Sequence, residues 1–210
     1  MTLGEATSAE ASGAWLVLVP VGSIEQHGPH LPLDTDVVIA TAVAHGVAAE
    51  LPGTWVAPPI PYGSSGEHQS FPGTSSIGTE ALTHVLVELA RSMRTWARRV
   101  VFVNGHGGNV AALDASDELE WVACATESHD LHAGFTETSL MLRLRPESVR
   151  LELAEAGNPQ RLREILPAMR TGGVAAVSPN GVLGDPAGAS PAAGDRALSA
   201  MVAEIVRALS

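Results

Sequence analysis

The sequence predicts an α/β fold with a mostly parallel sheet. Several short apolar runs are continuous and rich in β-branched residues, instead of alternating with polar residues. Such runs are typical of parallel strands that are buried on both faces. Segments with helical spacing lie between the runs, so strand and helix alternate along the chain. This alternation indicates βαβ units.

The first part of the chain is expected to contain two strands and one helix. Residues 14–22 form a continuous apolar run, which predicts a buried strand. Residues 37–53 show helical spacing and end in Leu-Pro-Gly, which is a helix stop signal. A short second strand is expected at residues 54–63. The polar residues 64–77 that follow predict a long loop.

The middle of the chain repeats this alternation. Residues 79–99 predict a long helix, with Thr79 as its N-cap and arginines at its end, where they complement the helix dipole. Residues 100–105 predict another buried strand and residues 109–119 a short helix. A further strand is expected at residues 120–128.

The last third of the chain is expected to be mainly helical. Residues 136–144 and 159–170 both show helical spacing. A small strand is expected at residues 172–179, and residues 194–209 predict a closing helix.

Domain organisation follows from length and pattern. The 210 residues suit one α/β domain with a sizeable core. Residues 1–13 are small, polar and mildly acidic, and predict a flexible N-terminal tail. Residues 14–210 contain no internal repeat and no linker, so they predict a single domain.

Charge and cysteine content limit the classes of partner and setting. The formal net charge of −11 argues against nucleic acids and anionic membranes as partners, because both bind basic surfaces. No apolar run reaches the ~18 residues that a transmembrane helix needs. The N-terminus lacks the basic and apolar parts of a signal peptide. Cys124 is the only cysteine, so no internal disulfide can form, and we expect a reduced, cytoplasmic setting.

Titratable side chains follow two of the expected strands directly. Glu25 and His27 are two residues apart, so both can face one site from extended backbone. Asp36 follows after a proline-rich loop, and His106 lies among glycines after the strand at residues 100–105. Ligand sites in open α/β sheets form at such strand ends. Each of these residues alone is more often a helix cap or a surface group than a ligand, but the combination predicts a metal site.

This ligand set also limits the metals and the chemistry. Mixed carboxylate and imidazole ligands suit Zn²⁺, Mn²⁺ or Fe²⁺. A carboxylate such as Asp36 can bridge two ions, and paired ions activate water for hydrolysis.

Two further clusters leave alternatives open. Glu137 opens an expected helix, where it is either a carboxylate that favours the helix dipole or a metal ligand. His132 lies nearby and can transfer a proton to a leaving amine. Glu67 and His68 lie on the long polar loop, which is either an unattached surface loop or a cover that contacts substrate.

Four motifs in order resemble the creatininase family of metal-dependent amidohydrolases. They read PVGSIEQHGPHLPLDTD, YGSSGEHQSFPGTSSIGTEAL, VNGHGGN and HAGFTETSLML. The resemblance runs from about Trp15 to the last helix. It implies a three-layer α/β/α sandwich, two divalent metal ions per subunit (Zn²⁺, Fe²⁺ or Mn²⁺), and a homo-oligomer of six or eight subunits.

The resemblance also implies roles for individual residues. Glu25, Asp36 and His106 would hold one ion, and His27 and Asp36 the second, with Asp36 bridging. Creatininase has a further glutamate ligand two residues after the histidine of its third motif, where this chain has Gly108. The resemblance makes Glu137 the candidate replacement and His132 the proton donor, so both are expected to be catalytic. Glu67 and His68 would contact substrate.

The activity that the resemblance implies is dinuclear metal-dependent hydrolysis of a C–N amide bond. The motifs are most similar to the branch of the family that trims a modified precursor peptide during maturation of a peptide-derived redox cofactor, releasing a Val-Tyr-derived dipeptide. An alternative within the family is hydrolysis of another small cyclic amide or formamide. A different class would be a binding or scaffold subunit that keeps the fold without turnover.

Overall fold

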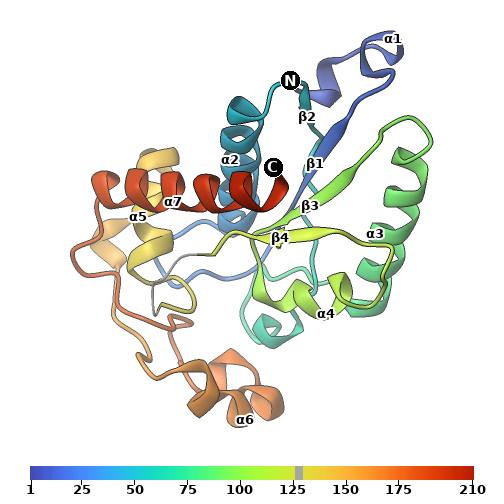
Figure 1. Cartoon of the computed structure of the whole chain (residues 1–210). Coiled ribbons are helices and arrows are strands. Elements are labelled where there is room, and N and C mark those ends of the chain that lie inside the picture. The colour runs from blue at the N-terminus through green and yellow to red at the C-terminus, as the bar shows by residue number, and fades with distance from the viewer. Residues whose placement is uncertain (126–129) are drawn as a thin grey trace.

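The computed structural model, which describes residues 1–125 and 130–210, contains one all-parallel sheet (Figure 1). Its strands in chain order are β1 Leu16–Val21, β2 Thr54–Val56, β3 Val100–Asn104 and β4 Trp121–Ala123. They are arranged in the order β2-β1-β3-β4, so β1 and β3 form the centre. Val17 of β1 pairs with Trp55 on one side and with Val100 on the other. The predicted parallel α/β fold is confirmed.

Helices cover both faces of this sheet. In the described residues the helices are α1 Ser8–Ala11, α2 Thr35–Glu50, α3 Thr79–Met93, α4 Val110–Leu113, α5 Phe135–Leu144, α6 Leu162–Gly172 and α7 Pro191–Leu209. Of these, α2, α5 and α7 pack on one face and α3 and α4 on the other. Leu16 and Leu18 of β1 point into the core shared with α2, α5 and α7. Val17 and Val19 point into the core shared with α3 and α4. The alternation along β1 therefore separates two cores, and the expected three-layer sandwich is confirmed.

Several element predictions differ from the structure. The strand predicted at residues 54–63 shortens to β2, and the helix predicted at residues 79–99 ends at Met93. The small strand predicted at residues 172–179 is wrong, because Gly173 has a positive φ and the chain turns into a 3-10 helix, Val174–Ala176. The helix predicted at residues 109–119 shortens to α4, which is capped at Asp114. The strand predicted at residues 120–128 is limited to β4 among the described residues, and residues 126–129 lie outside them. Gly78 takes the N-cap position of α3 that was predicted for Thr79.

The N-terminal residues contact the open edge of the sheet. The amino group of Met1 donates to the Thr54 carbonyl at 3.2 Å, and the Val56 N–H donates to the Met1 carbonyl at 2.8 Å. Main-chain pairing of this kind protects an edge strand from other chains. The flexibility predicted for residues 1–13 stays a prediction, as does the separation of this segment from a single domain at residues 14–210.

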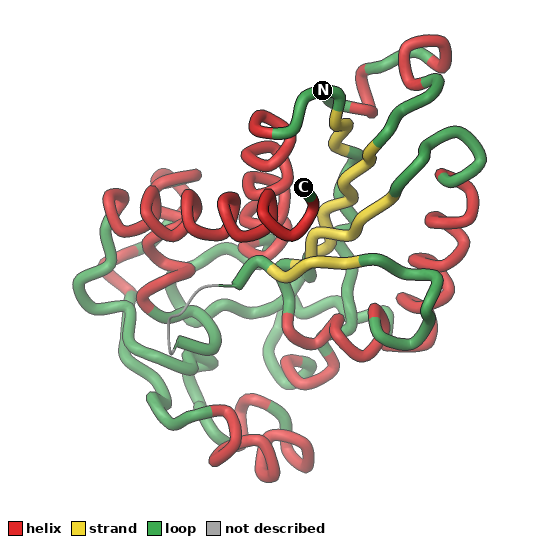
Figure 2. The backbone as a smooth tube through the Cα atoms, in the orientation of Figure 1, coloured by secondary structure: helices red, strands yellow, loops and turns green. Residues whose placement is uncertain are grey.

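A small lobe around α6 lies apart from the sheet (Figure 1). Long loops connect it to the other elements (Figure 2). Its core consists of Ile165, Val174 and Leu183, with Phe71 packed against it. Phe71 belongs to the loop that carries Glu67 and His68, so the lobe holds this loop in place. No helix in the described part of the chain is long and apolar enough to cross a membrane.

The loops after β1 and β3 both leave the sheet at the carboxyl ends of its strands, and they pack against the first turn of α2. A Cβ atom at Gly22 would lie 2.5 Å from the Val37 nitrogen, and one at Gly105 would lie 2.7 Å from the Asp36 carbonyl oxygen. Only glycine permits such close backbone approach. The first turn of α2 is thereby fixed between the two loops.

Candidate active site

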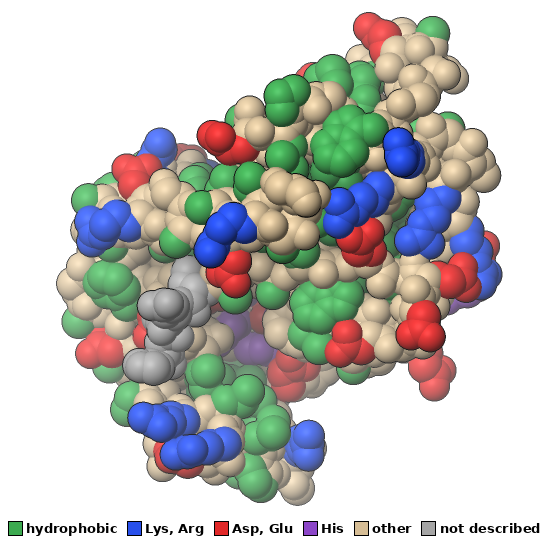
Figure 3. All heavy atoms as spheres, in the orientation of Figure 1, with side chains coloured by type: hydrophobic (Ala, Val, Ile, Leu, Met, Phe, Trp, Pro, Cys, Tyr) green, Lys and Arg blue, Asp and Glu red, His purple; other side chains and the backbone are tan. Residues whose placement is uncertain are grey.

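Residues from six segments converge at the carboxyl ends of the strands. Glu25, Gln26 and His27 come from the loop after β1, and Asp36 comes from the first turn of α2. His68 comes from the 3-10 helix Gly66–His68, His106 from the loop after β3, His132 from the segment before α5, and Glu137 from α5. The four histidines are buried, as are Glu25 and Asp36. Figure 3 shows histidine side chains inside a hollow of the surface.

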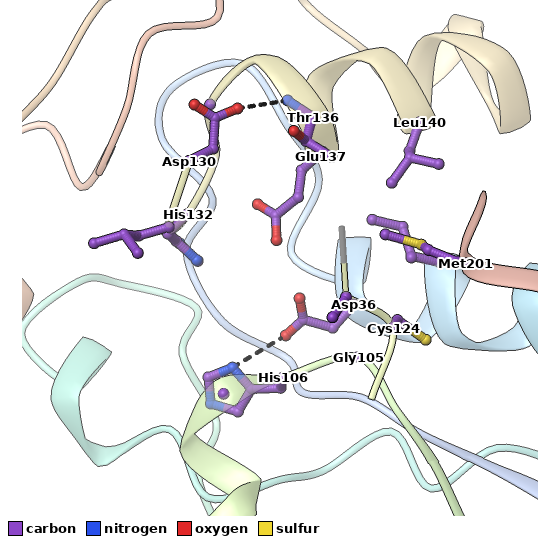
Figure 4. Close-up of a pocket in the computed structure, with 15 residues that line it drawn as sticks. Asp36, Gly105, His106, Cys124, Asp130, His132, Thr136, Glu137, Leu140 and Met201 are labelled. Carbon is purple, nitrogen blue, oxygen red and sulfur yellow. Dashed lines mark hydrogen bonds and ion pairs between the residues drawn. The ribbon is translucent and has the colours of Figure 1, made fainter. Parts of the chain in front are cut away.

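Asp36 lies between two histidines. Its Oδ1 is 3.0 Å from His27 Nε2. Its Oδ2 is 3.5 Å from His106 Nδ1 (Figure 4). On the other side of His106, Nε2 lies 3.1 Å from Glu25 Oε2. The structure therefore brings together the four residues that the strand-end argument selected, and each Asp36 oxygen faces a different histidine.

A hydrogen bond from Nδ1, the ring nitrogen that does not face Asp36, fixes the orientation of His27. Its Nδ1 lies 3.1 Å from the Glu25 carbonyl oxygen, which can only accept, so Nδ1 donates. Nε2 then faces carboxylate oxygens of Asp36 and, at 4.0 Å, of Glu137. Burial by itself would lower the pKa of His27, but the adjacent Asp36 charge and hydrogen bond raise it to about 10.

Three buried carboxylate oxygens in this cluster have no hydrogen-bond donor among the described residues. They are both oxygens of Glu25 and Oδ2 of Asp36. Burial and the nearby Asp36 charge raise the pKa of Glu25 to about 8. The pKa of His106, which burial would lower, is raised to about 9 by Glu25 and Glu67. Unpaired buried oxygens are costly, and carboxylate and imidazole donors suit Zn²⁺, Mn²⁺ or Fe²⁺, so these residues fit divalent cations.

The other two histidines both contact Gln26, which carries no charge. The side-chain nitrogen of Gln26 lies 2.8 Å from His68 Nδ1 and 3.0 Å from His132 Nε2. The His132 ring stacks against His68 and His27, with centroids 4.4 and 4.3 Å away. Burial lowers the pKa of His68 to about 4 and that of His132 well below its ordinary value. Both rings are therefore neutral at pH 7.

Two carboxylates border the cluster. Glu67 Oε1 lies 3.5 Å from His106 Nε2, so the polar loop does reach the site. Glu137 Oε2 accepts a 2.6 Å hydrogen bond from the Ala133 N–H and lies 4.0 Å from His27 Nε2. Glu137 thus satisfies backbone at the start of α5 and also faces the cluster. Its two predicted roles are compatible.

Gly108 replaces the glutamate ligand that the family resemblance implies at this position, and the space beside it is filled. A Cβ atom there would lie 2.5 Å from Glu67 Oε1 and would also overlap with His106 Nε2 and the Ser64 carbonyl. A side chain at this position is sterically excluded unless the polar loop moves. The missing side chain at Gly108 therefore leaves the space that the Glu67 carboxylate occupies in this site.

A cavity of about 260 Å³ opens beside Asp36 and Glu137 (Figure 4). Its apolar side is formed by Ile39, Leu140 and Met201, together with Cys124. Burial raises the pKa of the Cys124 thiol to about 12, so it is not a reactive group. Cys124 follows β4 directly and lines the cavity.

Sequence reasoning missed Gln26. Alternation along extended backbone places Glu25 and His27 on one side and turns Gln26 away from it. The sequence signal that could have found Gln26 is its position between two ligand candidates. In the structure all three residues are buried.

Comparison with known proteins decides the family. The family described as creatininase, creatinine amidohydrolase, matches residues 1–209. The chain belongs to the creatininase family. A mycofactocin precursor peptide peptidase of Mycobacterium tuberculosis is 54% identical over 223 residues, covering 98% of this chain and 89% of the relative. One from Mycolicibacterium smegmatis is 51% identical, covering 95% of this chain and 87% of the relative.

Solved creatininase structures share the fold over nearly the whole chain. A Zn-Zn type mutant creatininase superposes with a TM-score of 0.81 at 27% identity, covering 99% of this chain and 96% of that one. A structure titled creatininase Mn gives a TM-score of 0.81 at 28% identity with the same coverage. The predicted family resemblance is confirmed.

Proposed function

We propose that this creatininase-family protein is a metal-dependent peptidase that removes the modified C-terminal Val-Tyr dipeptide from the mycofactocin precursor peptide. The observation that carries the metal-dependent hydrolysis is the buried cluster in which Asp36 faces two histidines and carboxylate oxygens lack donors. The peptide substrate is supported by the relatives at 51–54% identity, whose names state that substrate.

The ligand assignment follows the contacts of the cluster. Glu25, Asp36 and His106 would hold one ion, and His27, Asp36 and Glu137 the second. Zn²⁺, Fe²⁺ or Mn²⁺ bound there would polarise the amide carbonyl and activate water. The creatininase structures of Zn-Zn and Mn type support this choice of metals.

The remaining roles belong to side chains of the chain itself. His132 is neutral and lies over the cluster, so it is placed to protonate the leaving amine. Glu137, which lines the cavity together with His132, would act in catalysis as a ligand of the second ion. Glu67 and His68 would contact the peptide from the polar loop, which the α6 lobe holds in place. The buried walls exclude bulk water from the reacting bond.

The same proposal includes assembly and location. We expect a cytoplasmic homo-oligomer of six or eight subunits, as the family resemblance implies. Light scattering during size-exclusion chromatography measures the mass directly. A monomer of 21.7 kDa would contradict the expected assembly.

Peptide cleavage followed by mass spectrometry tests the activity. The protein is incubated with the modified precursor peptide, with and without chelator. We expect chelator-sensitive release of the C-terminal dipeptide, and its loss in His106→Ala. His84→Ala, on an exposed face of α3, is the matched control and should keep activity. No cleavage by protein with bound metal would overturn the peptide substrate and favour a small cyclic amide or formamide. Activity retained in His106→Ala would overturn metal-dependent hydrolysis.

A further inference from the structure

The buried amide of Gln26 has a fixed orientation. Its Oε1 accepts a 2.8 Å hydrogen bond from the Gly28 N–H, and its Nε2 lies 3.0 Å from the Gly181 carbonyl oxygen. A backbone N–H only donates and a carbonyl oxygen only accepts, so the amide cannot be reversed without losing both bonds. Gly181 packs directly on this amide, since a Cβ there would overlap with Oε1.

This orientation determines where the proton of neutral His68 resides. Gln26 Nε2 also lies 3.0 Å from His132 Nε2, but that nitrogen donates to the Gln26 carbonyl oxygen at 2.7 Å and so cannot accept. The two amide hydrogens therefore go to the Gly181 carbonyl and to His68 Nδ1 at 2.8 Å. His68 Nδ1 must therefore accept, and its proton lies on Nε2. That nitrogen lies 3.3 Å from Glu25 Oε1.

The main-chain carbonyl of Gln26 determines which ring nitrogen of His132 carries the proton. His132 Nε2 lies 2.7 Å from the Gln26 carbonyl oxygen, which can only accept. The proton of His132 is therefore on Nε2. The lone pair of Nδ1 lies on the opposite side of the ring, 3.7 Å from Glu25 Oε1.

We propose that Gln26 is a positioning residue that selects the tautomers of both histidines, with its side chain acting on His68 and its carbonyl on His132. His68 then carries its proton on the nitrogen that lies 3.3 Å from Glu25 Oε1, while Glu25 Oε2 lies 3.1 Å from His106 Nε2. His132 presents Nδ1 as the nitrogen that exchanges a proton with substrate.

The consequence for catalysis rests on the proposed function. Hydrolysis breaks the C–N bond, adds the water oxygen to carbon, and moves one water proton to the leaving nitrogen. Nδ1 of His132 can take that proton and deliver it, while Nε2–H stays on the Gln26 carbonyl throughout. A proton on Nδ1 at the outset would block the first of these transfers.

Imidazole ¹⁵N spectroscopy tests the tautomers without reference to activity. Metal-stripped protein labelled at histidine nitrogens is compared with His68→Asn and His132→Asn, which identify the signals. We expect the protonated nitrogen to be Nε2 in both rings, and the unprotonated nitrogen to be Nδ1. In Gln26→Glu the carboxylate accepts instead of donating, so His68 should gain a proton on Nδ1 while His132 is unchanged. Nδ1-protonated rings in the unsubstituted protein would overturn the proposal.

Kinetics test the positioning role in metal-loaded enzyme. Gln26→Glu should lower kcat roughly 10- to 100-fold, the range for residues that orient ligands, with bound metal retained. KM should change less than about threefold, because no substrate contact is lost. Gln69→Glu adds the same charge on the same loop as His68 from an exposed position, and should change neither constant.

A double-mutant cycle separates positioning from general disruption. In a His68→Asn background, Gln26→Glu should cost less than about threefold more, because the ring on which it acts is absent. Additive losses would overturn the action through His68. Tautomers as expected with no peptide cleavage by any variant would instead contradict the proposed function and leave the tautomer assignment standing.

Discussion

Four buried histidines meet in this site and form two pairs with opposite acid–base behaviour. His27 and His106 have pKa values raised to about 10 and about 9. His68 has its pKa lowered to about 4, and that of His132 lies well below its ordinary value. Burial lowers the pKa in all four. Carboxylates of Asp36, Glu25 and Glu67 overcome it in the first pair, whereas the second pair contacts the amide and carbonyl of Gln26.

This difference shows that the role of a histidine depends on the partners of its ring nitrogens, and not on its distance from another histidine. The ring centroids of His27 and His132 are only 4.3 Å apart, yet their nitrogens face different partners. Nitrogens that face unpaired carboxylate oxygens suit a cation, and nitrogens held by amide groups suit proton transfer and orientation. Substitutions that act on one pair at a time test this difference.

The largest expected effect is on the first pair alone. Asp36→Asn removes the negative charge that faces both His27 and His106. We expect loss of at least one bound ion per chain and a fall in kcat/KM of roughly 10³-fold or more, since metal ions supply several kcal/mol of transition-state stabilisation. Elemental analysis and peptide cleavage rates measure both. The tautomers of His68 and His132 should be unchanged in the metal-stripped variant.

Asp34→Asn is the matched control for this substitution. Asp34 lies two residues earlier and pairs with Arg145 at 2.7 Å, with both side chains more than a third exposed. Exposed ion pairs contribute little to stability, so activity and bound metal should stay near those of the unsubstituted protein. Equal losses in both variants would show that the loop and not the Asp36 carboxylate is essential.

The first pair was predictable from sequence, and the second was only partly so. Glu25, His27, Asp36 and His106 could be selected because continuous apolar runs locate strand ends and the period of two aligns neighbours. The contacts that set His132 come from Gln26, 106 positions away in the chain. No local pattern records such a contact.

The element predictions show the same limit. The strand predicted at residues 172–179 failed because the small apolar residues there pack into the α6 lobe instead of the sheet. Local composition does not distinguish apolar residues that pack into the lobe from apolar residues that form a strand of the sheet. The parallel central strands were predictable because burial on both faces requires continuous apolar sequence.

A smaller effect is expected where the polar loop meets the first pair. Gly108→Ala introduces a Cβ atom that overlaps with His106 and lies 2.5 Å from Glu67 Oε1. The polar loop must shift, and we expect kcat/KM to fall roughly 10- to 100-fold. At Gly107 a Cβ would meet nothing within 4 Å, so Gly107→Ala is the matched control. Similar activities of the two variants would contradict the tight packing between Glu67, His106 and Gly108.

The smallest effect is the pH dependence of stability in metal-stripped protein. His27 and His106 have pKa values above the ~6.5 of an unfolded chain. Between these values the folded state binds more protons, so the stability they contribute is complete below ~6.5 and is lost as pH rises through 9 to 10. Glu25, with its pKa raised to about 8, acts in the same direction. Urea unfolding at several pH values should therefore show stability falling toward alkaline pH.

Variants of each pair show whether this alkaline loss belongs to the first pair. His27→Asn should reduce the slope above pH ~7 by up to about 1.4 kcal/mol per pH unit, the value for one proton. His68→Asn should leave that slope unchanged, because His68 has its pKa lowered to about 4 and has lost its proton well below this range. Saturating zinc should flatten the slope in the unsubstituted protein, since bound imidazoles carry no proton on the ligand nitrogen. If His68→Asn reduced the slope as much as His27→Asn, the two pairs would titrate as one group, and the division of roles within the site would be wrong.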